Sequence, residues 1–296
     1  MILTDGGTRI ALKNILVATD FSSASEAALN YAQGIARQYD AQMYVAHVIR
    51  PDAYQLVPPE SQRVALEQTR RYAEQQMANL LVSGKLRGIP HQVLVDQGDF
   101  WTVLSDMIDK HEVDLVVVGT HGRTGVRKLL LGSVAEQIFR LAVCPVLTVG
   151  PRVSGEMRAE ASLQRILYAT DFTPTSERAA GHALSLAQEH QAQLTLLHVV
   201  QESAETSPRN IALMKEYFTK KLHELVSPEA AMWCNPEFVV EFGMPADGIL
   251  RAAAEREADL IVLGVRRAAT YPGHLPPATA YKVVCQAHSP VLTVRG

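Results

Sequence analysis

The sequence predicts an α/β protein made of two tandem domains, each with a five-stranded parallel sheet. Three observations predict this fold. Short apolar runs rich in β-branched residues alternate with segments of helical spacing, which is typical of a parallel sheet covered by helices. The chain has 296 residues, enough for two domains. Finally, the second half repeats the strand sequences of the first half.

The first half contains five predicted strands and four predicted helices. We expect strands at residues 15–19, 43–49, 92–95, 115–119 and 145–149. A first helix follows Ser22 or Ser23, either of which can cap it, and Ser23 with Glu26 has the spacing of a capping box. Further helices are expected at about 60–86, near 102–110 and from Gly132 onward.

Right-handed crossovers between five such strands favour the order 3-2-1-4-5. In this order the sheet reverses between strands one and four, and ligands bind at the carboxyl ends of the strands that flank the reversal. Asp20 follows strand one and Gly119 ends strand four. The order therefore predicts a crevice in which Asp20 faces the loop after Gly119.

The repeat defines the predicted domains. The segment that starts at Ile15 recurs at Ile166, which is 151 positions later, whereas the one at Pro145 recurs at Pro290, only 145 positions later. We expect the six-residue deletion after the second strand. The predicted domains are residues 1–150 and 160–296, joined by a linker near 150–164. Their last strands, 145–149 and 290–294, are apolar edges that invite pairing, so the halves are expected to pack as a pseudo-twofold pair.

The stretch from Leu115 to Ser133 reads as strand, glycine-rich cationic loop and helix start. Glycine lets backbone approach an anion, and the first N–H groups of a helix have no partner within the helix. Together they can form a phosphate cradle. The alternative is a surface loop that uses glycine for turning and cations for solubility, and the pattern alone does not decide between the two. The stretch has neither the G-x-x-x-x-G-K-[ST] nor the G-x-G-x-x-G spacing.

The spacing Gly119-x2-Gly122-x9-Gly132-Ser133 resembles the ATP-binding signature G-2x-G-9x-G-[ST] of the universal stress proteins. The repeat resembles the tandem members of this family. The resemblance implies two Rossmann-like domains of adenine-nucleotide-binding type and a bound ATP, alone or with Mg²⁺ or Mn²⁺. No catalytic residue and no protein metal ligand is assigned. The candidate nucleotide-binding residues are Thr19, Asp20, Val48, Val118, Gly119, His121, Gly122, Arg123, Gly132, Ser133 and Val134.

Crevice position and the resemblance together suggest a role for each part of this set. Asp20 would accept hydrogen bonds from the nucleoside, although a turn carboxylate is the common use of Asp after a strand. Val48 would contact the adenine, the glycines would keep backbone near the phosphates, and Ser133 would add a hydroxyl. Arg127 and Lys128 are expected to be solvated loop charges, and His47 and His198 to be packing residues at strand ends.

The second half is expected to keep the fold and lose the cradle. Positions Gly119, Gly122, Gly132 and Ser133 correspond, 145 residues later, to Gly264, Arg267, Pro277 and Ala278. Proline lacks an N–H that could donate to phosphate, and alanine lacks the hydroxyl. Asp171 and Val199 remain, so we expect one ATP per chain.

Composition narrows the function classes. The net charge of −3 gives no field that favours nucleic acid. The three cysteines lie far apart and are expected to be small buried hydrophobes. The first residues do not form a signal peptide, and no apolar run is long enough to span a membrane, so the cytoplasm is expected.

Three functions stay open from the sequence. The first is a cytoplasmic ATP-binding sensor or regulatory module of the stress response, containing an internal pseudo-dimer and open to homodimerisation of the whole chain. The second is an enzyme, a slow ATPase or an adenylate-forming relative on the same fold. The third is a binder of a non-nucleotide ligand. The sequence offers no convincing catalytic base, so binding is better supported than turnover.

Overall fold

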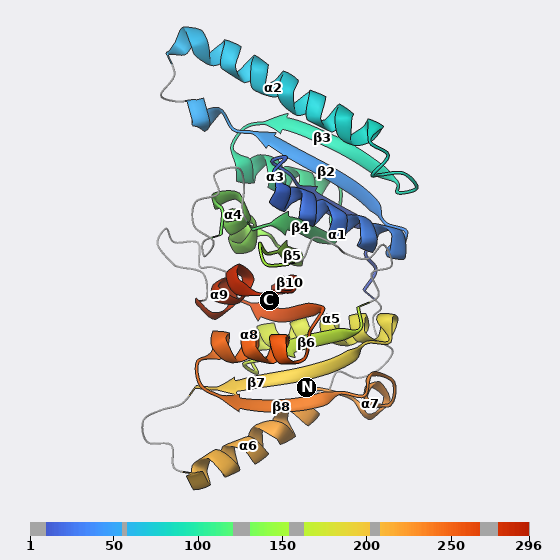
Figure 1. Ribbon diagram of the computed structural model, residues 1–296, viewed down its shortest axis with the longest axis vertical. Helices are drawn as coiled ribbons and strands as arrows, with labels where there is room; N and C mark the ends of the chain where they lie inside the picture. The colour runs from blue at the N-terminus through green and yellow to red at the C-terminus, as the bar shows by residue number, and fades with distance from the viewer. Residues whose placement is uncertain are drawn as a thin grey trace.

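The computed structural model describes residues 10–54, 58–120, 131–153, 163–201, 208–266 and 278–295. These residues form one ten-stranded sheet in the order β3-β2-β1-β4-β5-β10-β9-β6-β7-β8 (Figure 1). The strands are β1 Asn14–Ala18, β2 Gln42–Ile49, β3 His91–Gln97, β4 Leu115–Gly119, β5 Val146–Val149, β6 Arg165–Ala169, β7 Gln193–Val200, β8 Glu237–Phe242, β9 Leu260–Val265 and β10 Val291–Arg295. Within each half the strands are parallel, so the predicted 3-2-1-4-5 order is confirmed twice.

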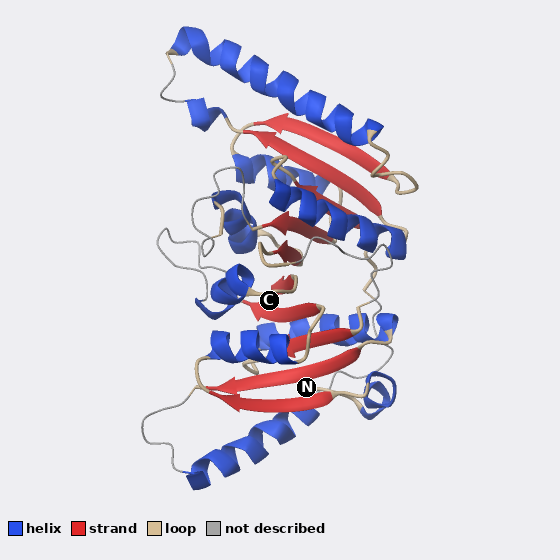
Figure 2. Cartoon of the chain, in the orientation of Figure 1, coloured by secondary structure: helices blue, strands red, loops and turns tan. Residues whose placement is uncertain are grey.

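Helices cover both faces of the sheet (Figure 2). They are α1 Ser23–Tyr39, the 3-10 turn η1 Pro51–Tyr54, α2 Pro59–Val82, α3 Phe100–Lys110, α4 Ser133–Leu141, α5 Pro174–His190, α6 Pro208–His223, α7 Pro228–Cys234, α8 Pro245–Glu255 and α9 Ala278–Gln286. Because side chains alternate along a strand, Ile15 and Val17 join the apolar cluster under α1, α2 and α5–α7. Leu16 and Ala18 join the cluster under α3, α4, α8 and α9.

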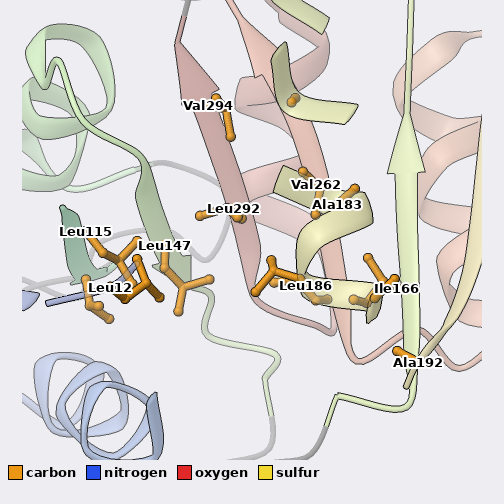
Figure 3. Close-up of a cluster of buried hydrophobic side chains, with 14 of the residues drawn as sticks. Leu12, Leu115, Leu147, Ile166, Ala183, Leu186, Ala192, Val262, Leu292 and Val294 are labelled. Atoms are coloured by element: carbon orange, nitrogen blue, oxygen red, sulfur yellow. The ribbon is translucent and has the colours of Figure 1, made fainter. Parts of the chain in front are cut away.

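The two halves meet where β5 and β10 pair antiparallel, which confirms the prediction that these two apolar edges pair with each other. Leu147 lies opposite Leu292 in this pairing, and Thr293 Oγ1 donates to the Val146 carbonyl oxygen at 3.2 Å. Figure 3 shows Leu147 and Leu292 together with Leu12, Leu115 and Leu186 in a cluster that spans both halves. One mixed sheet with a continuous apolar layer therefore joins the tandem domains.

Strand register locates the predicted deletion. Tyr44 pairs with Gln92 in the first half, whereas its counterpart Thr195 pairs with Glu237 in the second half. The offset is 151 at the first residue of each pair and 145 at the second, so all six residues are lost between the second and third strands. The first half places the long helix α2 there, and the second half places α6 and the short helix α7.

Some predicted element bounds were wrong. The helix expected at about 60–86 ends at Val82, because a turn with Gly84 at a φ of 75° follows it. The third strand is longer than the predicted residues 92–95 and reaches Gln97. Its outer residues are polar and exposed, and polar residues on an edge strand hide its extent from a pattern of buried residues.

A cavity of about 1010 Å³ lies between the halves. Its wall includes Leu12, Leu147, Leu186 and Leu292 of the shared apolar cluster. It also touches Leu115, the first residue of β4, and so reaches the end of that strand opposite Gly119. This cavity is therefore separate from the predicted crevice.

Candidate functional site

Strand register places the predicted crevice residues at one edge of the sheet. Ala18, the last residue of β1, pairs with Ala46 of β2 and with Val118 of β4. Thr19 and Gly119 follow directly after Ala18 and Val118, Val48 lies two residues after Ala46, and parallel strands present their carboxyl ends at the same edge. The structure thus brings together Thr19, Asp20, Val48, Val118 and Gly119, as the sequence analysis predicted.

The turn after β1 is held by its own side chains. Asp20 Oδ1 accepts a hydrogen bond from the Ser22 backbone N–H at 3.1 Å, and Ser22 Oγ accepts from the Ser25 N–H at 3.3 Å and caps α1. Of the two expected caps, Ser22 is therefore the one used. With Ser22 as the N-cap, the third helical residue is Ser25, so Glu26 does not hold the position that a capping box at Ser23 requires, and its carboxylate is bound by the Lys85 ammonium. Asp20 thus helps to hold the turn after β1.

His47 anchors the end of β1. Its Nδ1 lies 2.8 Å from the Thr19 carbonyl oxygen, a contact that requires the ring N–H to donate. Its ring lies 4.7 Å from the ring of Phe21, whose φ of 62° is in the left-handed region. His198 forms the same 2.8 Å contact with the Thr170 carbonyl oxygen in the second half. Both histidines therefore have the hydrogen-bonding and packing role expected of them.

The valines of the candidate set belong to one apolar surface. Val48 and Val134 are partly buried against the cluster under α3 and α4. The counterpart of Val48 in the second half, Val199, is buried, and its Cγ2 is 2.9 Å from the position that a Cβ on Gly248 would take. Val48 is more exposed than Val199. At this position the first half therefore offers a ligand more apolar side-chain surface than the second half does.

The ends of the glycine-rich loop are tied together. The Thr120 N–H donates to the Val149 carbonyl oxygen at 3.1 Å, and the Gly132 N–H donates to the Thr120 carbonyl oxygen at 2.7 Å. Residues 121–130, which include the candidates His121, Gly122 and Arg123, lie outside the described residues. The loop thus leaves and re-enters the described part of the chain at two adjacent backbone positions beside the end of β4.

Helix α4 begins where this loop returns. Gly132 is its N-cap and forms no side-chain cap, and Ser133 is exposed in its first turn. Gly132 has a φ of −63°, so its backbone conformation does not require glycine. The Leu131 N–H, one residue earlier, donates at 3.1 Å to the hydroxyl of Tyr281 in the second half. Tyr281 is not among the residues predicted for the site, because no motif or repeat marks a contact between residues this far apart.

Packing accounts for glycine at position 119. A Cβ there would lie 2.5 Å from the Ala24 carbonyl oxygen, inside contact distance of the α1 backbone. At the equivalent Gly264, a Cβ would lie 2.5 Å from Ser176 Cα in α5. Both halves thus require glycine where the first helix crosses the fourth strand, whether or not phosphate binds there.

The second crevice holds a charge pair. Arg266, the counterpart of His121, places its guanidinium 3.8 Å from the Asp171 carboxylate. Burial acts to raise the pKa of Asp171, but hydrogen bonds from Thr173 and the Arg266 charge outweigh it, and the pKa is lowered. Arg267 and Pro277 lie outside the described residues, and Ala278 is the first residue of α9.

The described residues contain neither a membrane-spanning helix nor a cluster of metal-ligating side chains. No helix among them is both long and apolar enough to cross a membrane. The same residues contain no group of three or more His, Cys, Asp or Glu side chains that could hold a metal ion. The three cysteines are free, and burial raises the pKa of each thiol to about 11, which disfavours the reactive thiolate.

The fold, with the same strand order in both halves, defines a tandem α/β protein of Rossmann-like type. Residues 11–150 and 162–295 both match the pattern of the universal stress protein family. A universal stress protein of Mycolicibacterium smegmatis is 27% identical over 95% of this chain and 96% of its own length. One from Methanocaldococcus jannaschii is 31% identical and covers 46% of this chain and 81% of its own length.

A solved structure agrees with these sequence matches. The universal stress protein of Archaeoglobus fulgidus superposes with a TM-score of 0.68 at 19% identity, covering 95% of this chain and 98% of its own. This chain belongs to the universal stress protein family, as a member with two such domains in tandem.

Proposed function

We propose that this protein binds ATP in the crevice of its first half and acts as a cytoplasmic sensor or regulatory module of the stress response. The observation that carries the proposal is the Gly132–Thr120 hydrogen bond. It ties the start of α4, which has no side-chain cap, to the end of β4 across the loop that contains Gly122, the remaining signature residue. Unpaired N–H groups at a helix start attract phosphate.

Each end of the nucleotide has a candidate partner in this proposal. The triphosphate would lie over the start of α4, where Gly132 and Ser133 supply backbone and a hydroxyl, with His121, Gly122 and Arg123 from the loop. The nucleoside would lie over the ends of β1 and β2, where Asp20 accepts hydrogen bonds and Val48 offers apolar surface. A divalent cation such as Mg²⁺ or Mn²⁺ would be held mainly by the phosphates, because such ions commonly keep few protein ligands in nucleotide sites.

The second half supports binding of a single nucleotide. Its signature retains only Gly264, and packing against α5 explains that glycine without a ligand. Arg266 is paired with Asp171, the residue that would otherwise receive the nucleoside. We therefore expect one ATP per chain.

Calorimetric titration with ATP and Mg²⁺ tests the proposal. We expect saturation at one ATP per chain and a large loss of affinity in Gly122→Arg, which places in the first half the residue that the second half carries at position 267. The matched variant Arg267→Gly should bind as the wild type does. Two ATP per chain, or unchanged affinity in a folded Gly122→Arg protein, would contradict the assignment of the site.

Two further measurements separate the alternative functions. Native mass spectrometry of the purified protein identifies any ligand that is not a nucleotide by its mass. Phosphate release at saturating ATP and Mg²⁺ measures turnover. Release that continues well beyond one phosphate per chain would show that the protein is an ATPase rather than a protein that only binds ATP.

A further inference from the structure

The second half contacts the helix that would receive phosphate in the first half. The hydroxyl of Tyr281, in the first turn of α9, accepts the hydrogen bond from the Leu131 N–H at 3.1 Å. Leu131 is 6% exposed, and Tyr281 packs against the same apolar cluster. The contact therefore joins a largely buried backbone group to a side chain whose position is set by the packing of α9.

The carboxyl end of α4 is also held by the second half. The Arg295 guanidinium, at the end of β10, donates to the carbonyl oxygens of Phe139 and Arg140. The last carbonyl groups of a helix have no partner within the helix and favour a cation. Helix α4, with only nine residues, thus has contacts from the second half at both of its ends.

The two halves make similar contacts at the carboxyl ends of α4 and α9, but not at the amino ends of these helices. At the carboxyl ends each half supplies an arginine to the other, since Arg152 of the first half donates to the Gln286 carbonyl oxygen of α9 at 3.3 Å. The two arginines are not at equivalent positions, because the counterpart of Arg295 is Gly150.

At the amino ends the halves do not match in chemistry. The counterpart of Tyr281, 145 positions earlier, is Glu136, and its carboxylate pairs with Arg140 of its own helix at 3.7 Å. The tyrosine is thus specific to the half that has lost its signature.

We propose that Tyr281 is a positioning residue for the phosphate end of the nucleotide site, through which the degenerate half orients the start of α4. The inference rests on the proposed binding of ATP in the first half. The hydrogen bond fixes the Leu131 amide, and the Gly132 amide that follows it donates to the Thr120 carbonyl oxygen. The Ser133 N–H at the start of α4 is then held in one orientation before the nucleotide arrives, and binding does not have to order it.

Tyr281→Phe tests this role because it removes one hydroxyl and little volume. A typical hydrogen bond contributes enough free energy for an expected loss of about two- to tenfold in affinity for ATP. Adenosine lacks phosphates, so its affinity should stay unchanged, and the ratio of the two affinities reports on the phosphate end alone. A purely structural effect of the substitution would lower both affinities together.

Tyr168→Phe is the matched control. It also removes a tyrosine hydroxyl from the second half, where Tyr168 donates to the Ser176 carbonyl oxygen at 2.6 Å, but it does not reach α4. It should lower the stability of the protein and leave the ratio of ATP to adenosine affinity unchanged. Equal ratios in wild type, Tyr281→Phe and Tyr168→Phe would overturn the proposal.

Hydrogen–deuterium exchange of the unliganded full chain gives a readout that does not depend on the nucleotide. The Leu131 amide should exchange faster in Tyr281→Phe than in the wild type or in Tyr168→Phe. If the wild type fails to bind ATP, the proposed function fails, and the role at the phosphate end falls with it. If the wild type binds ATP but the affinity ratio is unchanged in Tyr281→Phe, only the positioning role is overturned, whether or not the Leu131 amide exchanges faster.

Discussion

Gly119 and Ala24 approach so closely that a side chain at position 119 would place its Cβ 2.5 Å from the Ala24 carbonyl oxygen. The first glycine of the nucleotide signature thus has a structural role that does not depend on the ligand. The same relationship holds between Gly264 and Ser176, in the half where the rest of the signature is lost. A retained first glycine alone is therefore weak evidence for a nucleotide site in a domain of this fold.

This relationship predicts that Gly264→Ala destabilises the protein. The added methyl must displace the α5 backbone, and such overpacking costs about 1–3 kcal/mol in the free energy of unfolding. Gly181→Ala is the control, because a Cβ at this position within α5 meets nothing within 4 Å. It should leave stability unchanged or raise it by up to about 1 kcal/mol. Urea unfolding measures both, and equal stability of the two variants would contradict the packing role.

The proposed nucleoside contact predicts different effects of substituting Asp20 and Asp171. Asparagine keeps a carbonyl oxygen for the Ser22 N–H, so Asp20→Asn preserves the turn and removes the charge. Hydrogen bonds to charged groups contribute about 1.5–3 kcal/mol, so we expect a loss of about ten- to hundredfold in ATP affinity. Asp171→Asn, which keeps the same acceptor for Thr173, should bind ATP as the wild type does. Calorimetry compares the two variants. A larger loss of ATP affinity in Asp171→Asn than in Asp20→Asn would show that the nucleotide site lies in the second half, contrary to the proposal.

The carboxylate of Glu237 predicts a pH dependence of stability. Two hydrogen bonds from Arg256, each 3.0 Å long, lower the pKa of Glu237 below its usual 4.5 and outweigh the opposing effect of burial. Because the folded-state pKa is the lower one, its contribution is complete above the unfolded-state pKa. It is lost as the pH falls from about 4.5 through the depressed value.

Urea unfolding of wild type and Glu237→Gln at a series of pH values measures this contribution. The wild type should be the more stable at pH 7, and the difference should shrink below pH 5. The side chain is partly exposed, so solvent screening should keep the difference small. A gap in stability that stays constant down to pH 3 would show that the Glu237 charge contributes nothing.

Much of the fold could be predicted because its signals are local and occur twice. Apolar runs, helical spacing and the two repeat offsets were enough to predict strand order, the pairing of β5 with β10 and the position of the deletion. The contact between Tyr281 and Leu131 could not be predicted, because it depends on how two helices from different halves pack. The cap at Ser22 rather than Ser23 depends on the residue at which α1 starts, and both serines suit that position equally well.

The candidate site was predictable only in part. Register confirms that Asp20, Val48 and Gly119 reach one edge of the sheet, since parallel strands fix that edge. The role of Gly119 in helix packing was hidden, because a glycine required by a neighbouring backbone and one required by a ligand look identical in sequence. His121, Gly122 and Arg123 lie outside the described residues, so their roles stay predictions.

The antiparallel pairing of β5 with β10 has a consequence for how the protein responds to dilution. Two separate domains that met through these strands would dissociate at low concentration, and contacts across the junction, such as Tyr281 with Leu131, would be lost with them. Here both partners belong to one chain, so the junction forms at an effective concentration set by the connecting segment. Any property of the first half that depends on the second should therefore be the same in a cell that holds few copies of the protein as in one that holds many.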